Sequence, residues 1–447
     1  MRFTFVHAAD LHLDTPFQGI GQVSPEVAEL LRDASLDAFD ALVDHTLQAG
    51  ASFLLLAGDI YDGAERGLRA QLRFVKGLEK LAERGVPVFI CHGNHDPLGG
   101  APPSDAPPSA APPSGGLGQK GSGWSAVRSW PENVTIFGAD QVRRITVEQA
   151  GSAIAQVYGI SYGRRDVTEN LALRFSREEG EGLHLAMLHA NVGSNAEHAA
   201  YSPCSLDDLR DRGMDYWALG HVHSRRVLHE GGPWVVYPGN TQGRSFKPSE
   251  QGGKGAYLVE ADGNRVRRLS FLQTERLRFR RESLDVSRFD DLADLRRGLT
   301  EFAAAARADC GTAGLILDVR LEGTGPVHAD LACSGGVEEV LRDLRQEFEG
   351  ERPLVWWERV QDRTTPPVDL DAVRGRGDLA SEICALVDEK LESPELAEGL
   401  LASLIYPDRP HGLKRHLEKL TPNEERELLE RARLRAIELL DQADACE

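Results

Sequence analysis

The chain has 447 residues, of which 41% are hydrophobic, and its 51 basic and 70 acidic side chains give a net charge of −19. A chain of this length can bury a large core and is expected to form roughly two to four domains. The acidic balance excludes a histone-like protein that binds nucleic acid through overall basicity, but it allows a nucleic-acid enzyme with a local basic patch.

The six cysteines lie far apart, and no two of them form a Cys-x-x-Cys pair. This spacing argues against a disulfide framework or a zinc knuckle and favours reduced thiols. No apolar run approaches the ~20 residues that a membrane span requires, and residues 1–14 lack the apolar stretch of a signal peptide. We therefore expect a soluble, cytoplasmic protein without a membrane segment.

The first 275 residues alternate short apolar runs, which suit strands, with stretches of helical period. Strands are predicted at residues 3–8, 52–56, 86–91, 134–137, 155–160, 183–188, 216–219, 234–237 and 256–260. Helices are predicted at residues 25–48 and 68–84. This order predicts a layered α/β domain over residues 1–275.

One segment of this domain, residues 98–123, breaks the pattern. An Ala-Pro-Pro-Ser unit repeats at Ala101, Ala106 and Ala111 and then gives way to Gly and Ser. Such a composition cannot bury enough apolar surface to offset its chain entropy. We interpret residues 98–123 as a disordered surface insertion.

The character of the chain changes after residue 275. A small βαβαβ unit is predicted over residues 276–364, with strands at 276–284, 315–321 and 353–360 and helices at 289–308 and 337–348. Residues 365–447 are predicted to be helical, with a capping box that starts the last helix at Thr421. From residue 276 onward there are 37 acidic and 25 basic side chains, so the C-terminal region is predicted to bind a protein partner rather than DNA.

Five short motifs place a side chain of a metal-binding type just after a predicted strand. They are Asp10-Leu11-His12, Gly58-Asp59, Gly93-Asn94-His95-Asp96, Leu188-His189-Ala190-Asn191 and Gly220-His221-Val222-His223. Because the carboxyl ends of strands in an α/β sheet meet at one edge, we expect these side chains to converge. Asp, His and Asn without Cys suit manganese, iron or zinc in a catalytic site.

Each motif alone is weak evidence, since a lone His is usually a structural or surface residue. We interpret His92, at the end of its strand, as structural, and we give the structural or surface interpretation to most histidines outside the motifs. These are His7, His45, His184, His198, His229, His411 and His416. Five motifs in a fixed order, each after a strand, are much harder to obtain by chance.

The ordered set of motifs resembles that of the calcineurin-like metallophosphoesterase superfamily. Longer strings resemble its bacterial DNA repair exonuclease branch, which includes the YhaO-like and SbcD-like proteins; they lie at residues 1–13, 57–62, 159–162 and 237–244. The resemblance covers residues 1 to about 275 and extends loosely to the βαβαβ unit, which takes the place of a DNA-capping domain. It implies a metallophosphoesterase β-sandwich flanked by helices.

The resemblance also implies two adjacent divalent metal ions, with Mn²⁺ favoured. The ligands of the first ion would be Asp10, His12 and His223. The ligands of the second ion would be Asn94, His189 and His221. Asp59 would bridge the two ions.

Further side chains of the reaction are implied beside the metals. His95 would contact the scissile phosphate, and Asp96 would orient its imidazole. Asp62 stands where the archaeal and eukaryotic branch carries a second catalytic His. Among the basic side chains, Arg244 is predicted to bind DNA, because it follows a Gly-Asn turn that we expect to face the cleft. The other candidates for DNA contacts are Arg164, Arg165, Arg225, Arg226, Lys247 and Lys254.

These features predict a metal-dependent DNA exonuclease or endonuclease of DNA repair. The resemblance implies an SbcC-like coiled-coil ATPase as its partner and leaves a homodimer open. One alternative is a small-molecule phosphodiesterase or phosphatase of the same superfamily, but such an enzyme would not need the two C-terminal units. Another is a non-catalytic scaffold, against which the retention of every expected ligand position counts.

Overall fold

The computed structural model describes residues 1–18, 20, 25–63, 67–99, 130–193, 201–392 and 421–444. Their contacts divide the chain into two compact units. Unit 1 comprises Met1–Arg280, Ala306–Leu317 and Gly350–Glu358, and unit 2 comprises Arg281–Ala305, Asp318–Glu349 and Arg359–Glu447. The insertion predicted at residues 98–123 lies outside the described residues, except for Leu98 and Gly99.

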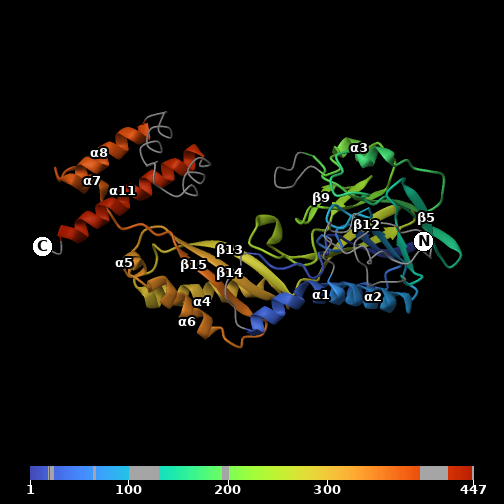
Figure 1. Ribbon diagram of the computed structural model, residues 1–447, viewed down its shortest axis with the longest axis horizontal. Coiled ribbons are helices and arrows are strands. Elements are labelled where there is room, and N and C mark those ends of the chain that lie inside the picture. Colours follow the sequence, from blue (N-terminus) through green and yellow to red (C-terminus); the bar gives the residue numbers. More distant parts are fainter. Residues whose placement is uncertain are drawn as a thin grey trace, which may run out of the picture. The chain divides into compact units, whose positions relative to one another are not determined.

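Unit 1 contains two six-stranded sheets (Figure 1). The strands of the first are β1 (Arg2–Ala8), β2 (Leu54–Ala57), β3 (Val88–Cys91), β4 (Val134–Ile136), β11 (Gly255–Asp262) and β12 (Arg265–Gln273). The strands of the second are β5 (Arg143–Gln149), β6 (Ser152–Gly159), β7 (Leu183–His189), β8 (Tyr216–Gly220), β9 (Arg226–His229) and β10 (Trp234–Tyr237). The first sheet has the order β12-β11-β1-β2-β3-β4, and the second has the order β5-β6-β7-β8-β10-β9.

The strands that carry the motifs run parallel to one another within each sheet. In the first sheet β1 to β4 pair in parallel, and in the second β6, β7, β8 and β10 do so. Most of these strands are buried on both faces, which explains their nearly continuous apolar sequences. Their carboxyl ends share one edge of each sheet, and the five motifs begin there.

The two sheets stack face to face over a shared apolar core. Phe53 and Leu55 point into this core, whereas Leu54 between them points to the helices on the other face, as the alternation of a strand requires. The rings of Phe5 and Tyr216 meet across the two sheets edge to face, with 5.4 Å between their centroids. This packing holds together the two edges that carry the motifs.

Helices cover both outer faces of the sandwich (Figure 1). The first sheet is covered by α1 (Pro25–Gln48) and α2 (Leu68–Ala82), and the second by η2 (Leu171–Arg174) and α3 (Leu206–Arg210). Acidic side chains of α1 pair with basic side chains of α2 in the pairs Asp33–Arg69, Asp37–Arg73, Asp40–Arg73 and Asp44–Lys80. The layers are helix, sheet, sheet and helix, which confirms the predicted fold class.

A third sheet follows in the chain. Its strands, in the order in which they pair, are β13 (Leu277–Asp285), β14 (Gly314–Glu322) and β15 (Val355–Asp362), and the connecting helices are α4 (Leu292–Ala308), α5 (Val327–Ala332) and α6 (Gly336–Glu347). The predicted βαβαβ order is present, with α5 added. Asp318 on the central strand is fully buried and accepts hydrogen bonds from Arg281, Arg359 and Gln361.

The described C-terminal residues form three helices, α7 (Leu370–Arg374), α8 (Leu379–Glu392) and α11 (Pro422–Asp444). The predicted capping box is present, because the Thr421 N–H donates to Oε2 of Glu424 at 2.7 Å and the Glu424 N–H donates to Oγ1 of Thr421 at 3.4 Å. Ile437 of α11 packs with Val373 and Cys384 of the other two helices. None of the helices in the described part of the chain is long and apolar enough to cross a membrane.

Three strands of unit 1, β5, β9 and β12, were not predicted from the sequence. Each lies at an edge of its sheet, and most of its side chains are exposed or half-buried. A strand in this position needs no continuous apolar run, and charged residues protect it from pairing with other chains. The signal used for the buried strands is therefore absent at these edges.

Candidate metal centre

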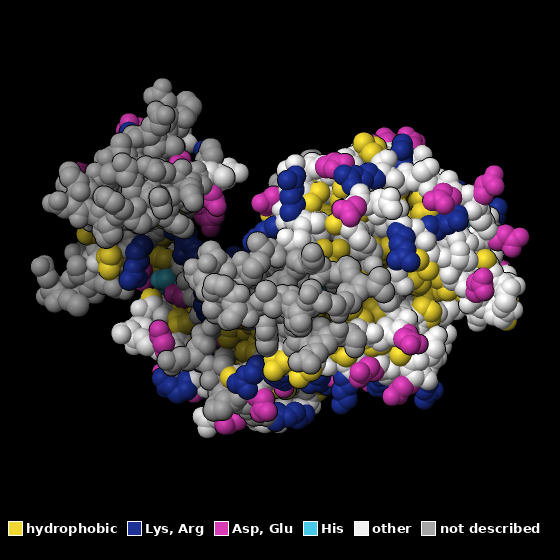
Figure 2. All heavy atoms as spheres, turned by 45° about the vertical axis from the view of Figure 1, so that its right-hand side comes forward, with side chains coloured by type: hydrophobic (Ala, Val, Ile, Leu, Met, Phe, Trp, Pro, Cys, Tyr) yellow, Lys and Arg dark blue, Asp and Glu magenta, His cyan; other side chains and the backbone are white. Residues whose placement is uncertain are grey.

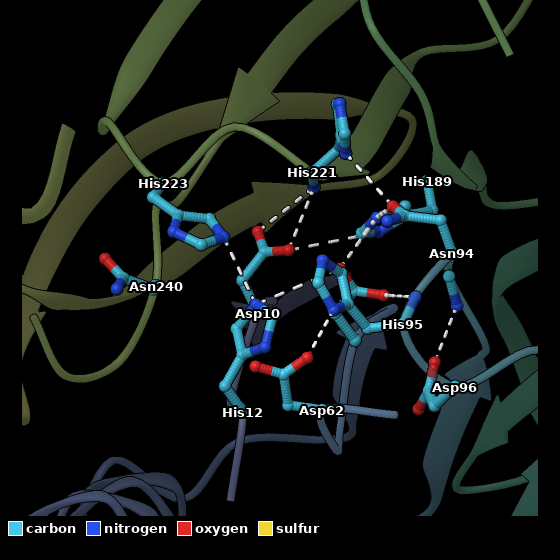
Figure 3. Close-up of polar contacts among 12 residues, drawn as sticks. Asp10, His12, Asp62, Asn94, His95, Asp96, His189, His221, His223 and Asn240 are labelled. Atoms are coloured by element: carbon cyan, nitrogen blue, oxygen red, sulfur yellow. Dashed lines mark hydrogen bonds and ion pairs between the residues drawn. The ribbon is translucent and has the colours of Figure 1, made fainter. Parts of the chain in front are cut away.

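All predicted metal ligands lie together at the carboxyl ends of the strands, and Figure 3 labels each of them except Asp59. Asp10 and His12 follow β1, Asp59 follows β2, Asn94 follows β3, His189 ends β7, and His221 and His223 follow β8. Four of them, Asp10, His12, Asp59 and His221, have φ angles of 52°, 44°, 51° and 100°. Residues other than glycine rarely adopt this left-handed conformation, and the surrounding packing must sustain its cost. The tight turns after the strands are therefore part of the site.

The first cluster consists of Asp10, His12 and His223, whose ligand atoms all lie within 4.8 Å of one another. The two histidine Nε2 atoms face each other at 3.2 Å. Asp10 is fully buried, and both of its carboxylate oxygens lie 3.1 Å from the backbone N–H of His221. Asp10 is thereby held at the junction of the two sheets.

The second cluster surrounds Oδ1 of Asn94. Nε2 of His189 lies 3.1 Å from this oxygen, and Nδ1 of His221 lies 3.2 Å from it. The other ring nitrogen of His189 donates to the backbone oxygen of Ala57 at 3.0 Å, so Nε2 is the ring nitrogen that can bind a metal ion in place of a proton. Asp59 stands between the clusters, with Oδ2 3.2 Å from Nε2 of His189 and 3.8 Å from Nε2 of His12.

These distances fit divalent ions. Two ligand atoms about 2.1 Å from one ion are roughly 3.0–3.4 Å apart at angles near 90–110°. The separations of 3.1 and 3.2 Å within both clusters lie in this range. The donors are imidazole nitrogens and amide or carboxylate oxygens, which suit manganese, iron and zinc. The residues present therefore fit two ions, with Asp59 placed to bridge them.

The electrostatics of the site demand positive charge. Burial raises the pKa of Asp10. Burial also raises the pKa of Asp59, but His189, His12 and His95 lower it further, so that its net pKa lies well below the ordinary value. For His189, burial lowers the pKa, but Asp59 and Asp10 raise it to about 9. Both carboxylates are buried, so a cation bound among their oxygens would offset the cost of burying their charge.

His95 lies beside the ligands, and its ring is held by Asp62 (Figure 3). The backbone N–H of His95 donates to Oδ1 of Asp59 at 2.9 Å, and its ring Nδ1 bonds to Oδ1 of Asp62. Oδ2 of Asp62 lies 3.4 Å from the guanidinium of Arg244. A third group of possible cation ligands consists of His12, Asp62 and His95. The guanidinium of Arg244 already forms an ion pair with Asp62 of this group.

Asp96 does not have the role that we predicted for it. Its Oδ2 accepts from the Ile60 N–H and bonds to Nδ1 of His92, each at 2.9 Å, and its Oδ1 accepts from the Gly93 N–H at 2.9 Å. Asp96 therefore orders the loop that carries Asn94. The orientation of His95 by Asp96 is corrected, since Asp62 is the carboxylate that bonds to its ring.

Glu250 is a site residue that the sequence did not reveal. It ends the short helix η3 (Pro248–Glu250), and its side chain is buried. Its Oε1 accepts from Nδ1 of His223 at 2.7 Å, and its Oε2 accepts from Nδ2 of Asn240 at 2.9 Å. A glutamate in a loop rich in Ser, Gly and Pro carries no periodic signal, so only the fold identifies it.

The basic residues proposed for DNA contact have different environments. Arg244 is 87% buried beside Asp62 and Glu250. Lys254 is buried and donates to the backbone oxygen of His223 at 2.8 Å, so its prediction as a DNA-binding residue is corrected. Arg225 is exposed and lies over the ring of Phe271. The remaining exposed candidates are Arg164, Arg165, Arg226 and Lys247.

Comparison with known proteins shows the family of the chain. Residues 3–225 match the calcineurin-like phosphoesterase family, and residues 279–365 match the middle domain of metallophosphoesterase YhaO. The chain belongs to the calcineurin-like metallophosphoesterases, which confirms the predicted resemblance. It is 32% identical over 444 residues to the metallophosphoesterase YhaO of Bacillus subtilis (strain 168), and the alignment covers 98% of both chains.

More distant relatives are DNA double-strand break repair proteins. The Mre11 protein of Sulfurisphaera tokodaii is 23% identical over 51% of this chain and 54% of its own length. The Mre11 protein of Thermoplasma acidophilum is 27% identical over 52% of this chain and 57% of its own length. This chain thus spans little more than half the length of these two relatives.

Proposed function

We propose that the protein is a two-metal phosphodiesterase that hydrolyses DNA, as an exonuclease or an endonuclease, in DNA repair. The observation that carries this proposal is the pair of ligand clusters with Asp59 between them and His95 at their side. The distant similarity to Mre11 proteins supports DNA as the substrate. We propose Mn²⁺ as the native metal, because four histidines and three oxygen donors suit it better than Mg²⁺.

The ligand assignment follows the two clusters. Asp10, His12 and His223 would hold one ion. Asn94, His189 and His221 would hold the other, and Asp59 would contact both. When bound, the two ions supply Lewis acidity and lower the pKa of an attacking water.

The side chains around the ions act on the phosphate. Since Nδ1 of His95 is engaged by Asp62, its Nε2 is the donor available to a phosphoryl oxygen as negative charge develops there. Asp62 keeps the imidazole in the orientation and tautomer that this requires. Arg244 adds planar N–H donors on the same side of the site, and we propose that it contacts the DNA backbone next to the scissile phosphate.

The rest of the DNA would meet scattered basic side chains. On the face shown in Figure 2, basic and acidic side chains of the described residues are interspersed and do not form a single basic surface. Arg164, Arg165, Arg226 and Lys247 are the exposed candidates.

For the C-terminal region, residues 365–447, we propose a protein partner, namely an SbcC-like coiled-coil ATPase in the cytoplasm. Ile437 packs against other residues of the chain. Four leucines of α8 and α11 are about half exposed, namely Leu379, Leu386, Leu428 and Leu439. A coiled-coil partner would cover such leucines. Changing Leu428 and Leu439 to Asp should abolish capture of the ATPase and leave hydrolysis of short DNA intact, whereas unchanged capture would contradict the proposal.

The substrate is tested with double-stranded DNA and bis(p-nitrophenyl) phosphate, each with Mn²⁺ and with chelator. We expect metal-dependent cleavage of both. Arg244→Gln should weaken cleavage of DNA, and the control Arg268→Gln, which changes an exposed side chain on β12, should not. Hydrolysis of the small diester without cleavage of any DNA would instead indicate a small-molecule phosphodiesterase.

A further inference from the structure

The carboxylate of Glu250 has N–H donors of His223, Asn240 and Arg244 around it. It is 6% exposed. Its Oε1 accepts from Nδ1 of His223 at 2.7 Å and lies 3.6 Å from Nη2 of Arg244. Its Oε2 accepts from Nδ2 of Asn240 and from the backbone N–H of Arg244, each at 2.9 Å. One buried carboxylate therefore contacts a ligand of the first cluster and the guanidinium on the phosphate side.

Arg244 connects Glu250 to the residues on the other side of the site. Its Nη1 lies 3.4 Å from Oδ2 of Asp62, and the other oxygen of Asp62 bonds to the ring of His95. Cationic or N–H donor groups alternate with carboxylates along the series His223, Glu250, Arg244, Asp62 and His95. Because a carboxylate holds the guanidinium at each end, its position depends on both.

We propose that Glu250 is a positioning residue that couples the two halves of the site: it orients His223 for metal ligation and, through Arg244, supports Asp62 and His95 on the phosphate side. By accepting the Nδ1 proton of His223, Glu250 leaves Nε2 as the ligating atom, and this nitrogen faces His12. The phosphate half of this role rests on the proposed function, whereas the metal half depends only on the ligand geometry.

A carboxylate is required at position 250 because every group around it donates. Gln has one acceptor oxygen and an NH₂ group that is itself a donor. In Glu250→Gln the amide would point its N–H groups at donors of His223, Arg244 or Asn240. We therefore expect the ring of His223 and the guanidinium of Arg244 to lose their fixed positions while the fold of the sandwich is kept.

The metal half is tested by titrating metal-stripped protein with Co²⁺, followed by visible absorption, and with Mn²⁺, followed by calorimetry. Glu250→Gln should lower the affinity for one of the two ions about 10–100-fold and leave the affinity for the other ion nearly unchanged. The matched control is Asp318→Asn, which also removes a buried, fully hydrogen-bonded carboxylate, but from the three-stranded sheet. This control should lower the melting temperature without changing either metal affinity.

Unchanged affinities in folded Glu250→Gln protein would overturn the metal half of the proposal. If Glu250→Gln does not fold, Glu250→Asp takes its place. Asp keeps the negative charge, but its side chain is one methylene shorter and places the carboxylate farther from His223. Glu250→Asp should lower the affinity for the same ion by a smaller factor. An affinity equal to that of the wild type would again overturn the assignment.

The phosphate half is tested by a double-mutant cycle with Arg244→Gln, using hydrolysis of bis(p-nitrophenyl) phosphate at saturating metal. Glu250→Gln should raise KM about tenfold in the wild-type background and much less in the Arg244→Gln background. Additive effects on KM would overturn the coupling through Arg244. If the wild type hydrolyses no phosphodiester, the proposed function fails, and the Co²⁺ titration still decides whether Glu250 positions His223.

Discussion

The Nε2 atoms of His12 and His223 face each other at 3.2 Å, although 211 positions separate the two residues in the chain. His12 follows β1 of the first sheet, and His223 follows β8 of the second. The first cluster is therefore complete only when the two sheets are stacked. Metal binding should consequently be linked to the stability of the whole sandwich.

Removal of the metal should destabilise the protein. Without ions, the buried carboxylates of Asp10 and Asp59 lose the divalent cations and keep imidazoles and backbone N–H groups as close partners. A ligand at one hundred times its Kd stabilises a fold by about 2.7 kcal/mol. We expect chelator to lower the melting temperature by several degrees, Mn²⁺ to restore it, and Mg²⁺ to restore it less. Identical melting curves with chelator and with Mn²⁺ would contradict this.

Asp59 and His95 should respond differently to substitution. Asp59→Asn removes charge from the bridge between the clusters, so it should deplete bound metal as measured by elemental analysis. His95→Ala should keep the metal and lose about 10²–10³ in the rate of DNA hydrolysis, since it removes a donor to the developing charge. If His95→Ala loses metal as fully as Asp59→Asn does, His95 is a ligand. Full activity of His95→Ala would exclude its role in the transition state.

Asp62 and Asp96 can be separated in the same way. Asp62→Asn should keep the metal and lower kcat about 10–100-fold, because the imidazole of His95 loses its hydrogen-bonded carboxylate. Asp96→Asn should mainly lower the melting temperature and the metal content, because the carboxylate of Asp96 holds the loop of Asn94 through two backbone N–H groups. Calorimetry and steady-state kinetics on both variants check this. The opposite pattern would restore Asp96 as the partner of His95.

Gly93 provides a steric test of the second cluster. A Cβ at this position would lie 2.3 Å from Oδ1 of Asp59 and 2.7 Å from Nε2 of His189. Its backbone does not require glycine, so Gly93→Ala should act by displacing these two ligands and weaken metal binding at least tenfold. Gly138→Ala is the matched control, since its added Cβ has no neighbour within 4 Å. Equal metal affinities of the two variants would show that the ligands are placed differently.

His7 should make the stability of the metal-stripped protein sensitive to acid. Burial lowers its pKa from 6.5 to about 3, while Tyr216 and the Leu219 carbonyl hold its neutral ring. Between these values the unfolded chain binds one proton more than the folded chain, so His7 costs about 1.4 kcal/mol per pH unit as the pH falls from 6.5 towards 3. Urea unfolding with chelator at pH 4.5–6.5 should show a shallower loss of stability for His7→Asn. Parallel curves for the two proteins would contradict the prediction.

The order of the buried strands along the chain and the places of the candidate ligands at their ends could be predicted from the sequence for one physical reason. A parallel strand buried on both faces must be apolar along its length, so β2, β3, β7 and β8 are visible as apolar runs, and a polar side chain directly after such a run marks the sheet edge. Asp59, Asn94 and His189 were found in this way. The edge strands β5, β9 and β12 escaped prediction because exposure removes the apolar pattern.

Only the tertiary structure shows which side chains contact one another within the site. Asp96 is adjacent to His95 in the chain, yet the carboxylate at its ring is Asp62, which is 33 positions away. Glu250 and Lys254 lie in a loop without any recognisable motif, and the fold brings both to His223. Hydrogen bonds depend on distances of a few tenths of an ångström and on the turn geometry of each loop. Residue type and spacing along the chain specify neither, so these contacts could be established only once the two sheets were stacked.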